Sequence, residues 1–274
     1  MKSLDADVST TQYALAVGDA GERRLRAISE LLAPTTRRLL ETAGIRRGMR
    51  VADIGCGVGR VSAMLAELVG PEGEVVGVDL SPAQVEQSRS LAAACRLTNC
   101  RFVEASAMAT GLPSASFDLV YGRLLLIHLP DPVGALREMS RLLTENGVLA
   151  YEDCEVATAG SEPDSALGQF AVLLTALGPR IGSDWNLGRR LVQLVRQAGL
   201  HLRDVNAIQG VVADGEHRRI LEWTIAEAGP ALVKTGLLSE AALDQTLREM
   251  HAAGHDDQLL VFMPRMLQVI AAKQ

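Results

Sequence analysis

The chain has 274 residues, 27 basic and 33 acidic side chains, a net charge of −6, and 48% apolar residues. This composition excludes a wholly disordered chain, and the acidic balance argues against nucleic-acid binding by phosphate neutralisation. The four cysteines form neither a CxxC pair nor a regular framework, which favours free thiols in a reducing cytoplasm. The sequence shows no signal-peptide pattern and no apolar run long enough to cross a membrane.

Strands and helices alternate along the chain as far as Glu155. Residues 22–43 are expected to form two helices separated at Pro34, ahead of a core. Short strands are then predicted at 48–54, 74–78, 101–104, 117–121 and 147–151, with helices at 60–69, 82–95 and 132–143. Repeated alternation of this kind predicts a parallel sheet with helices on both faces and right-handed crossovers.

After Glu155 the alternation stops. The sequence predicts helices at 163–179, 187–198 and 216–253, a strand at 201–207, and a last strand at 259–271. The expected division is a helical cap (1–44), a core (45–155), a helical lid insert (156–184), a core continuation (185–212), a second helical insert (213–257) and a final strand (258–274). Both inserts follow the carboxyl edge of the sheet, where open α/β folds bind ligands.

The strongest motif is a glycine-rich turn between the first strand of the core and its helix. It reads Asp53-Ile-Gly55-Cys-Gly57-Val-Gly59, and Asp79 ends the next strand. Glycines at this turn let backbone approach a ligand closely, and the second acid can accept hydrogen bonds from ribose hydroxyls. Dinucleotide folds instead use GxGxxG and bind a pyrophosphate, which a buried carboxylate at Asp53 would repel. The motif therefore favours a nucleoside that carries a positive charge.

Residues Val51–Arg60 resemble motif I of the class I S-adenosylmethionine-dependent methyltransferases. The resemblance covers about residues 35–155 and extends to further motifs in the same order, namely Asp79, Glu104–Met108 with Gly111–Pro113, Phe117–Tyr121 and Leu126–Pro132. It implies a Rossmann-like, doubly wound, mostly parallel seven-stranded sheet with helical lid insertions. It also implies S-adenosyl-L-methionine as the cofactor.

By this resemblance Gly55 and Gly57 approach the methionine portion, Asp53 orients its amino group, and Asp79 holds the ribose. Ser106 and Ala107 lie beside the adenine, although Ser106 stands where the family commonly has Asp. The full set of candidate cofactor-binding residues is Tyr13, Asp53, Gly55, Cys56, Gly57, Asp79, Leu80, Ser106, Ala107, Met108 and Arg123.

Two of these candidates have further expectations attached. Tyr13 and the Arg23-Arg24-Leu25 run resemble an N-terminal segment that some small-molecule members fold over the cofactor, the alternative being an unattached tail with a solvated basic run. The Arg123 backbone carbonyl is expected to face the methionine ammonium, and its guanidinium to pair with a carboxylate such as Asp53.

Methyl transfer requires mainly that the acceptor be held in line with the methyl group. His128, after the fourth strand, is the candidate general base, and its structural alternative is a histidine that orders the loop. The adjacent carboxylates of Glu152 and Asp153 suggest a metal-binding site, but neighbouring residues alternate across a strand, so only one of them can face the site. No metal is expected.

The sequence thus predicts a cytoplasmic methyltransferase that acts on an O, N or C atom of a small, apolar organic acceptor, without nucleic-acid or membrane partners. A homodimer is considered. The apolar stretches Phe170–Leu177 and Ile220–Ile225 either line the acceptor pocket or form lid core or a dimer contact. Two alternatives stay open: an enzyme that uses the bound sulfonium for a rearrangement, cyclisation or elimination, and a non-catalytic binding member.

Overall fold

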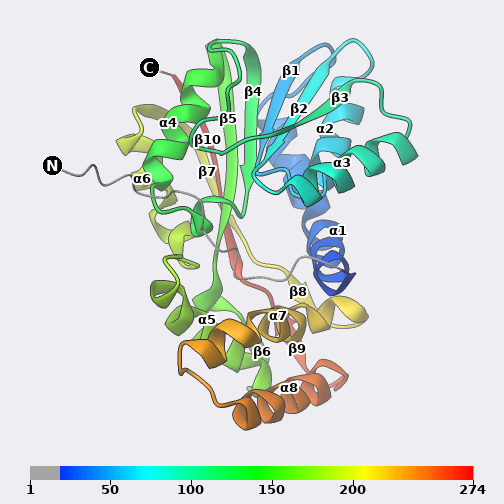
Figure 1. Ribbon diagram of the computed structural model, residues 1–274, viewed down its shortest axis with the longest axis vertical. Coiled ribbons are helices and arrows are strands. Elements are labelled where there is room, and N and C mark those ends of the chain that lie inside the picture. The colour runs from blue at the N-terminus through cyan, green and yellow to red at the C-terminus, as the bar shows by residue number, and fades with distance from the viewer. Residues whose placement is uncertain (1–18, 274) are drawn as a thin grey trace, which may run out of the picture.

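The computed structural model describes residues 19–273, and its main feature is a seven-stranded sheet in the order β3-β2-β1-β4-β5-β10-β7 (Figure 1). The strands β1 to β5 pair parallel, and β10 runs antiparallel to both β5 and β7. This confirms the predicted fold class. The strands are β1 (Arg50–Ile54), β2 (Glu74–Asp79), β3 (Cys100–Glu104), β4 (Phe117–Arg123), β5 (Leu143–Glu155), β7 (Leu200–Ile208) and β10 (Arg265–Lys273).

Helices cover both faces of this sheet. In Figure 1, α2 (Arg60–Val69) and α3 (Pro82–Ala94) lie on one face, and α4 (Pro132–Leu142) and α6 (Leu191–Gln197) on the other. The start of α3 follows from its sequence, because the Ser81 hydroxyl accepts a hydrogen bond from the Gln84 N–H and Pro82 takes the first helical position. The same local chemistry begins α4, where the Asp131 carboxylate caps the Gly134 N–H at 2.8 Å.

Beneath the sheet lies a second layer that contains both inserts. It holds α5 (Gln169–Leu177), α7 (Ile220–Lys234), α8 (Glu240–Gly254) and a small antiparallel sheet of β6 (Gly160–Glu162), β9 (Leu260–Phe262) and β8 (Val211–Val212). The core and the second layer also contain short 3-10 helices: η1 (Leu126–His128), η2 (Val156–Thr158), η3 (Ala166–Gly168), η4 (Gly178–Arg180), η5 (Leu187–Arg190) and η6 (Glu216–Arg219). Among the described helices, none is both long and apolar enough to span a membrane.

The small sheet was not predicted, and it changes the end of the chain. The single last strand expected at 259–271 is in fact two strands, β9 and β10, in two different sheets. Pro264 lies between them, and a proline cannot donate a ladder hydrogen bond. Each short strand lies close in sequence to a strand of the large sheet: β6 follows β5 after η2, β8 follows β7, and β9 precedes β10. The second layer is therefore connected to the core through these strands.

The prediction of two helices separated at Pro34 is wrong, because α1 (Asp19–Thr42) is a single helix with Pro34 inside it. A proline costs a helix one hydrogen bond, and here packing on both sides of it compensates. Before Pro34, the buried Arg24 pairs with Glu227 of α7 at 2.9 Å. After it, the Thr36 hydroxyl donates to the buried Glu152 carboxylate of β5 at 2.5 Å. The helix therefore connects the core with the second layer.

Candidate functional site

A cavity of about 500 Å³ lies at the carboxyl ends of β1, β2 and β4, between the core sheet, α1 and the loop before η5. Of the candidate residues, Asp53, Gly55, Cys56, Gly57, Asp79, Leu80, Ser106, Ala107, Met108, Arg123 and His128 all line it. Tyr13 lies outside the described residues. The structure therefore brings the described candidates together around one space, while their individual roles stay predictions.

The glycine turn forms one wall of this cavity. Gly55 and Gly57 have φ values of +74° and +54°, a region that favours glycine. A Cβ atom on Gly55 would lie 3.0 Å from the side chain of Leu125, so the turn packs directly against the loop that follows β4. Bare backbone thus faces the cavity where the sequence predicted a close approach.

Asp79 ends β2 beside this turn. Its two carboxylate oxygens accept hydrogen bonds from the N–H groups of Gly57 and Ser81, both at 2.9 Å. Burial raises the pKa of Asp79 above its usual value, and these two bonds oppose that shift. The carboxylate is thereby fixed in orientation and retains lone pairs for further donors such as ribose hydroxyls.

Asp53 is almost completely buried within β1 and accepts a hydrogen bond from the Ser62 hydroxyl at 2.5 Å. Burial raises the pKa of Asp53 to about 6, against the opposing effects of that hydrogen bond and of the Arg123 charge. Because a buried carboxylate is stabilised by a nearby cation, this position suits a ligand with an ammonium group.

The expected pairing of the Arg123 guanidinium with Asp53 is wrong. Arg123 donates to the hydroxyls of Thr36 at 3.2 Å and Ser29 at 3.4 Å, and it forms no ion pair with any carboxylate whose side chain the structure describes. Those two hydroxyls belong to α1, so the guanidinium holds this helix against the cavity. The positive charge of Arg123 still opposes the rise that burial causes in the pKa of Asp53, but without direct contact between the two groups.

Two large apolar side chains are exposed where the cavity opens near β2 and β3. Leu80 is 62% exposed and Met108 is 38% exposed. Between β3 and this edge, the Ser106 hydroxyl accepts a hydrogen bond from the Met108 N–H at 3.2 Å. Exposed apolar surface beside a polar turn fits a flat heterocycle such as adenine.

The opposite end of the cavity is mostly apolar. Sequence analysis missed most of its residues, which come from α1, from the loop after β4, and from the segment before η5: Leu25, Ile28, Ser29, Leu124, Leu125, Leu129, Pro130, Ile181 and Ser183. We call this region the acceptor end. The position of Leu124 and Leu125 directly after β4 could have identified them, because ligands bind beyond the carboxyl ends of parallel strands.

His128 is the titratable candidate at the acceptor end. Its ring lies edge-on to the Trp185 ring, with 6.5 Å between centroids, and its backbone N–H donates to the Leu125 carbonyl. Burial, and then the positive charge of Arg24, lower the pKa of His128 to about 4. The imidazole is therefore neutral at pH 7.

Other candidates lie away from the cavity. The stretches Phe170–Leu177 and Ile220–Ile225 do not line it, because α5 and α7 pack on each other as the core of the second layer. Glu152 and Asp153 are both fully buried in β5, and neither lines the cavity. No group of three or more potential metal ligands occurs among the residues that the structure describes.

Comparison with known proteins agrees with this arrangement. The family model described as a methyltransferase domain matches residues 45–191, which is more than half of the chain. The chain belongs to this methyltransferase family. Its expected fold and its resemblance to S-adenosylmethionine-dependent members are thereby confirmed.

Among curated relatives, this methyltransferase chain is 39% identical over 134 residues to aklanonic acid methyltransferase DauC of Streptomyces sp. (strain C5). It is 37% identical over 109 residues to demethylmenaquinone methyltransferase of Listeria monocytogenes serotype 4a. The matches span 49% and 40% of this chain and only 60% and 46% of those relatives.

Two solved structures share the fold. A putative methyltransferase from Bacillus halodurans aligns with a TM-score of 0.61 at 17% identity, covering 86% of this chain and 97% of that one. The [4+2]-cyclase SpnF aligns with a TM-score of 0.56 at 18% identity, covering 88% and 80%. At these identities the likeness shows the architecture alone.

The titration of Asp53 gives a pH prediction for cofactor binding. The ammonium group of a ligand binds the ionised carboxylate, so affinity is greatest well above pH 6 and falls as the pH drops through the pKa of about 6, by up to about tenfold per unit. The dissociation constant of S-adenosylhomocysteine, measured calorimetrically from pH 5 to 7.5, checks this. Asp53→Asn removes the step near pH 6, and an unchanged step in that variant would contradict the assignment.

Proposed function

We propose that this protein is an S-adenosylmethionine-dependent methyltransferase that methylates an O, N or C atom of a small, apolar organic acceptor. One observation carries the proposal: a single cavity joins a polar end, with Asp53 and Asp79, to an apolar end that contains His128. The polar end fits a cationic nucleoside, and the apolar end has room for a second molecule beside it. The family match to residues 45–191 supports the same reaction.

Each part of the cavity has a role in this proposal. Asp53 and the Gly55–Gly57 backbone hold the methionine portion, Asp79 holds the ribose, and Leu80, Ser106, Ala107 and Met108 enclose the adenine. Tyr13 is proposed to cover the methionine end, as in the resemblance. When bound, the cofactor supplies an electrophilic methyl group on a sulfonium leaving group. The apolar walls exclude water and orient the acceptor, which is the main requirement for transfer.

His128 is proposed to accept a proton or a hydrogen bond from the acceptor. The ring is neutral at pH 7 because its pKa is lowered to about 4, so it can accept but is a weak base. We expect His128→Ala to lower kcat by about 100-fold, the lower end of general-base effects, without changing cofactor affinity.

The control for this prediction is His128→Asn, which keeps a polar side chain but cannot take up a proton. Steady-state rates and calorimetric cofactor binding are measured for both variants. If Asn preserves the rate and Ala does not, His128 orients the acceptor instead of removing its proton. Full turnover in both variants would remove His128 from the mechanism.

The proposed function is tested with a tritiated methyl donor. Aklanonic acid and demethylmenaquinone, named for two relatives, are the first acceptors, followed by a library of phenols, enols and amines. Label transferred to an acceptor supports the proposal. An acceptor that is altered without gaining label, with the donor intact, favours the rearrangement or cyclisation alternative. Failure of the protein to bind either the donor or S-adenosylhomocysteine would overturn both.

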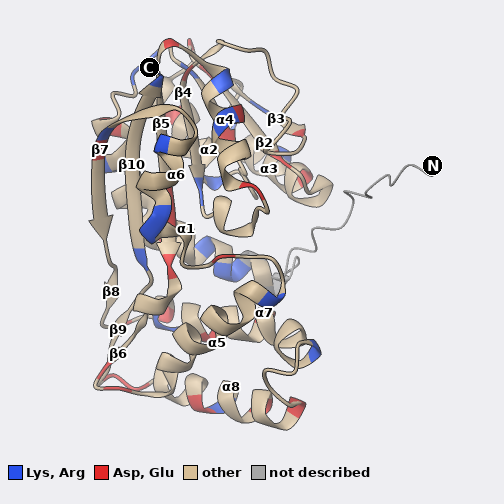
Figure 2. Cartoon of the chain, turned by 90° about the vertical axis from the view of Figure 1, so that its left-hand side faces the viewer, with Lys and Arg blue, Asp and Glu red and all other residues tan. Residues whose placement is uncertain are grey.

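We propose that the protein acts on small molecules in the cytoplasm and does not bind nucleic acid. All four cysteines are free thiols, and basic and acidic residues are interspersed along both layers of the molecule (Figure 2). Over the residues drawn in colour, this distribution forms no basic stripe of the kind that nucleic-acid-binding surfaces usually carry. A homodimer is the proposed assembly, and sedimentation equilibrium at micromolar concentration tests it.

A further inference from the structure

The loop from Leu124 to Leu129 contributes much of the acceptor end, and its backbone is held unusually firmly. Leu124, Leu125, His128 and Leu129 line the cavity. Leu124 has a φ of +52°, which is uncommon for a leucine, and its N–H donates to the Glu152 carbonyl at 3.0 Å. A backbone in this conformation persists only when its surroundings fix it.

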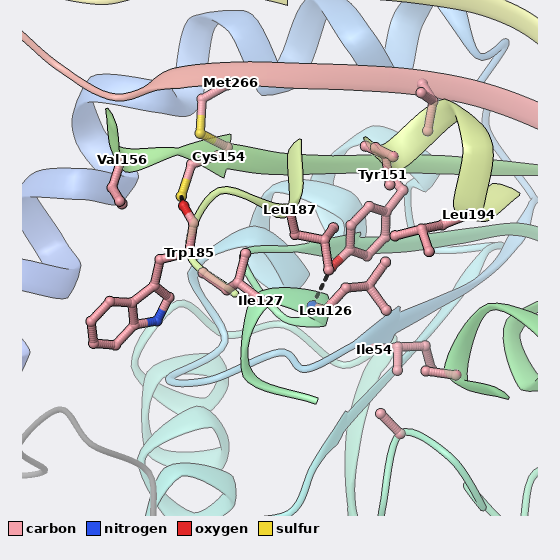
Figure 3. Close-up of a cluster of buried hydrophobic side chains, with 14 of the residues drawn as sticks. Ile54, Leu126, Ile127, Tyr151, Cys154, Val156, Trp185, Leu187, Leu194 and Met266 are labelled. Atoms are coloured by element: carbon pink, nitrogen blue, oxygen red, sulfur yellow. Dashed lines mark hydrogen bonds between the residues drawn. The ribbon is translucent and has the colours of Figure 1, made fainter. Parts of the chain in front are cut away.

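The phenol of Tyr151 is the centre of these fixing contacts. Tyr151 lies in β5, is fully buried, and does not line the cavity. Its oxygen accepts hydrogen bonds from the N–H groups of Leu126 at 2.8 Å and Leu125 at 3.2 Å. Figure 3 shows the Tyr151 ring reaching across from its strand to Leu126, with this bond dashed.

Asp153 extends the same network two residues along the strand. Its Oδ2 accepts a hydrogen bond from the Tyr151 hydroxyl at 3.1 Å and from the Ile127 N–H at 3.4 Å, and its Oδ1 accepts from the Cys154 N–H at 2.9 Å. The carboxylate is fully buried and also lies outside the cavity lining. Three consecutive backbone N–H groups of the loop, those of Leu125, Leu126 and Ile127, therefore donate hydrogen bonds to one tyrosine–carboxylate pair.

The loop that this pair holds contacts both the glycine turn and the segment before η5. The Leu125 side chain packs against Gly55, where even a Cβ atom would approach to 3.0 Å. On the far side of the loop, the Ile127 carbonyl accepts the Asp184 N–H at 2.9 Å. A change in the position of the loop would thus shift His128 and Leu125 together against the cofactor end.

We propose that Tyr151 and Asp153 are positioning residues for the acceptor: through the amides of Leu125, Leu126 and Ile127 they fix the distance between the acceptor end and the glycine turn. The inference rests on the proposed function. In-line transfer depends steeply on this distance, since a displacement of about 1 Å can cost about 100-fold in rate. Neither residue touches cofactor or acceptor, so cofactor affinity does not depend on them.

The test is Tyr151→Phe, which removes one oxygen and keeps the ring. We expect hydrogen exchange at the Leu125 and Leu126 amides to accelerate in the S-adenosylhomocysteine complex. We also expect kcat to fall about 10- to 100-fold with aklanonic acid or demethylmenaquinone, whichever the wild-type protein methylates, or else with the library compound that it methylates. The dissociation constant of S-adenosylhomocysteine should stay within about twofold.

A matched control and a second pair of variants separate positioning from general destabilisation. Val69→Ala removes buried methyl groups at the far end of α2 and should lower stability without changing kcat or exchange in the loop. Asp153→Asn keeps an acceptor oxygen for the Tyr151 hydroxyl and should retain more turnover than Asp153→Ala.

The outcomes distinguish this inference from the proposed function. If the wild-type protein transfers no methyl group to any acceptor, the proposed function fails, and the exchange measurement alone decides whether Tyr151 holds the loop. If the wild-type protein is active but Tyr151→Phe exchanges and turns over as the wild type does, the positioning role is overturned. A fall in kcat that Val69→Ala reproduces would overturn it as well.

Discussion

Replacing Asp79 by Ala is expected to weaken binding of S-adenosylhomocysteine by about 100-fold or more. The carboxylate is held by the N–H groups of Gly57 and Ser81, so it meets a ribose in a fixed orientation. Loss of two hydrogen bonds to a charged group, each contributing about 1.5 kcal/mol or more, gives about 3 kcal/mol. Isothermal titration calorimetry with S-adenosylhomocysteine measures the change.

The chain offers a matched control for Asp79 one strand away. Glu104 ends β3 in register with Asp79 but lies outside the cavity lining. Glu104→Ala removes an acid from the same sheet edge and should leave the dissociation constant unchanged. Equal losses in both variants would mean that the general negative charge of the edge, and not a specific contact with Asp79, determines affinity.

The second large effect concerns stability. Arg24 of α1 and Glu227 of α7 form an ion pair with side chains only 5% and 4% exposed and a 2.9 Å Nε–Oε1 distance. Arg24→Met or Glu227→Leu alone leaves one buried charge without its partner, which costs about 3–5 kcal/mol. Urea unfolding of each variant gives the free energy of unfolding.

The double variant should recover most of that loss. The second nitrogen of Arg24, Nη2, and the second oxygen of Glu227, Oε2, have no hydrogen-bond partner among the described residues, so the pair is incompletely satisfied. The neighbouring Arg23 forms a similar bond to Glu216 in an exposed position, and Arg23→Met should change stability little. If both single variants of the buried pair unfold as the wild type does, α1 is not held by this contact.

The sequence predicted those elements whose structure depends on residues that are close together in the chain. The cap at Ser81 and the glycine turn at Gly55 each act within a few residues, so their pattern indicates strand, turn and helix directly. Most described cavity residues at the cofactor end follow from the same motif. These features depend little on the rest of the chain.

Contacts between distant segments could not be predicted in this way. Helix α1 continues through Pro34 because Glu152 and Glu227, more than a hundred residues away, hold its two halves. The acceptor end depends on Ile181 and Ser183, which no pattern marks as binding residues. Tyr151 resembles any buried strand residue in sequence, and only the fold reveals what its hydroxyl contacts.

The closeness in sequence of β5, β7 and β10 to β6, β8 and β9 has a consequence for protein engineering. Because the chain passes between the core and the second layer at four places, between Glu155 and Gly160, between Arg180 and Leu187, between Ile208 and Val211, and between Phe262 and Arg265, no single graft can exchange it. A chimera that imports the lid of a relative needs all four junctions at once. A transplant at one junction alone would separate β9 from its neighbours and leave the small sheet incomplete.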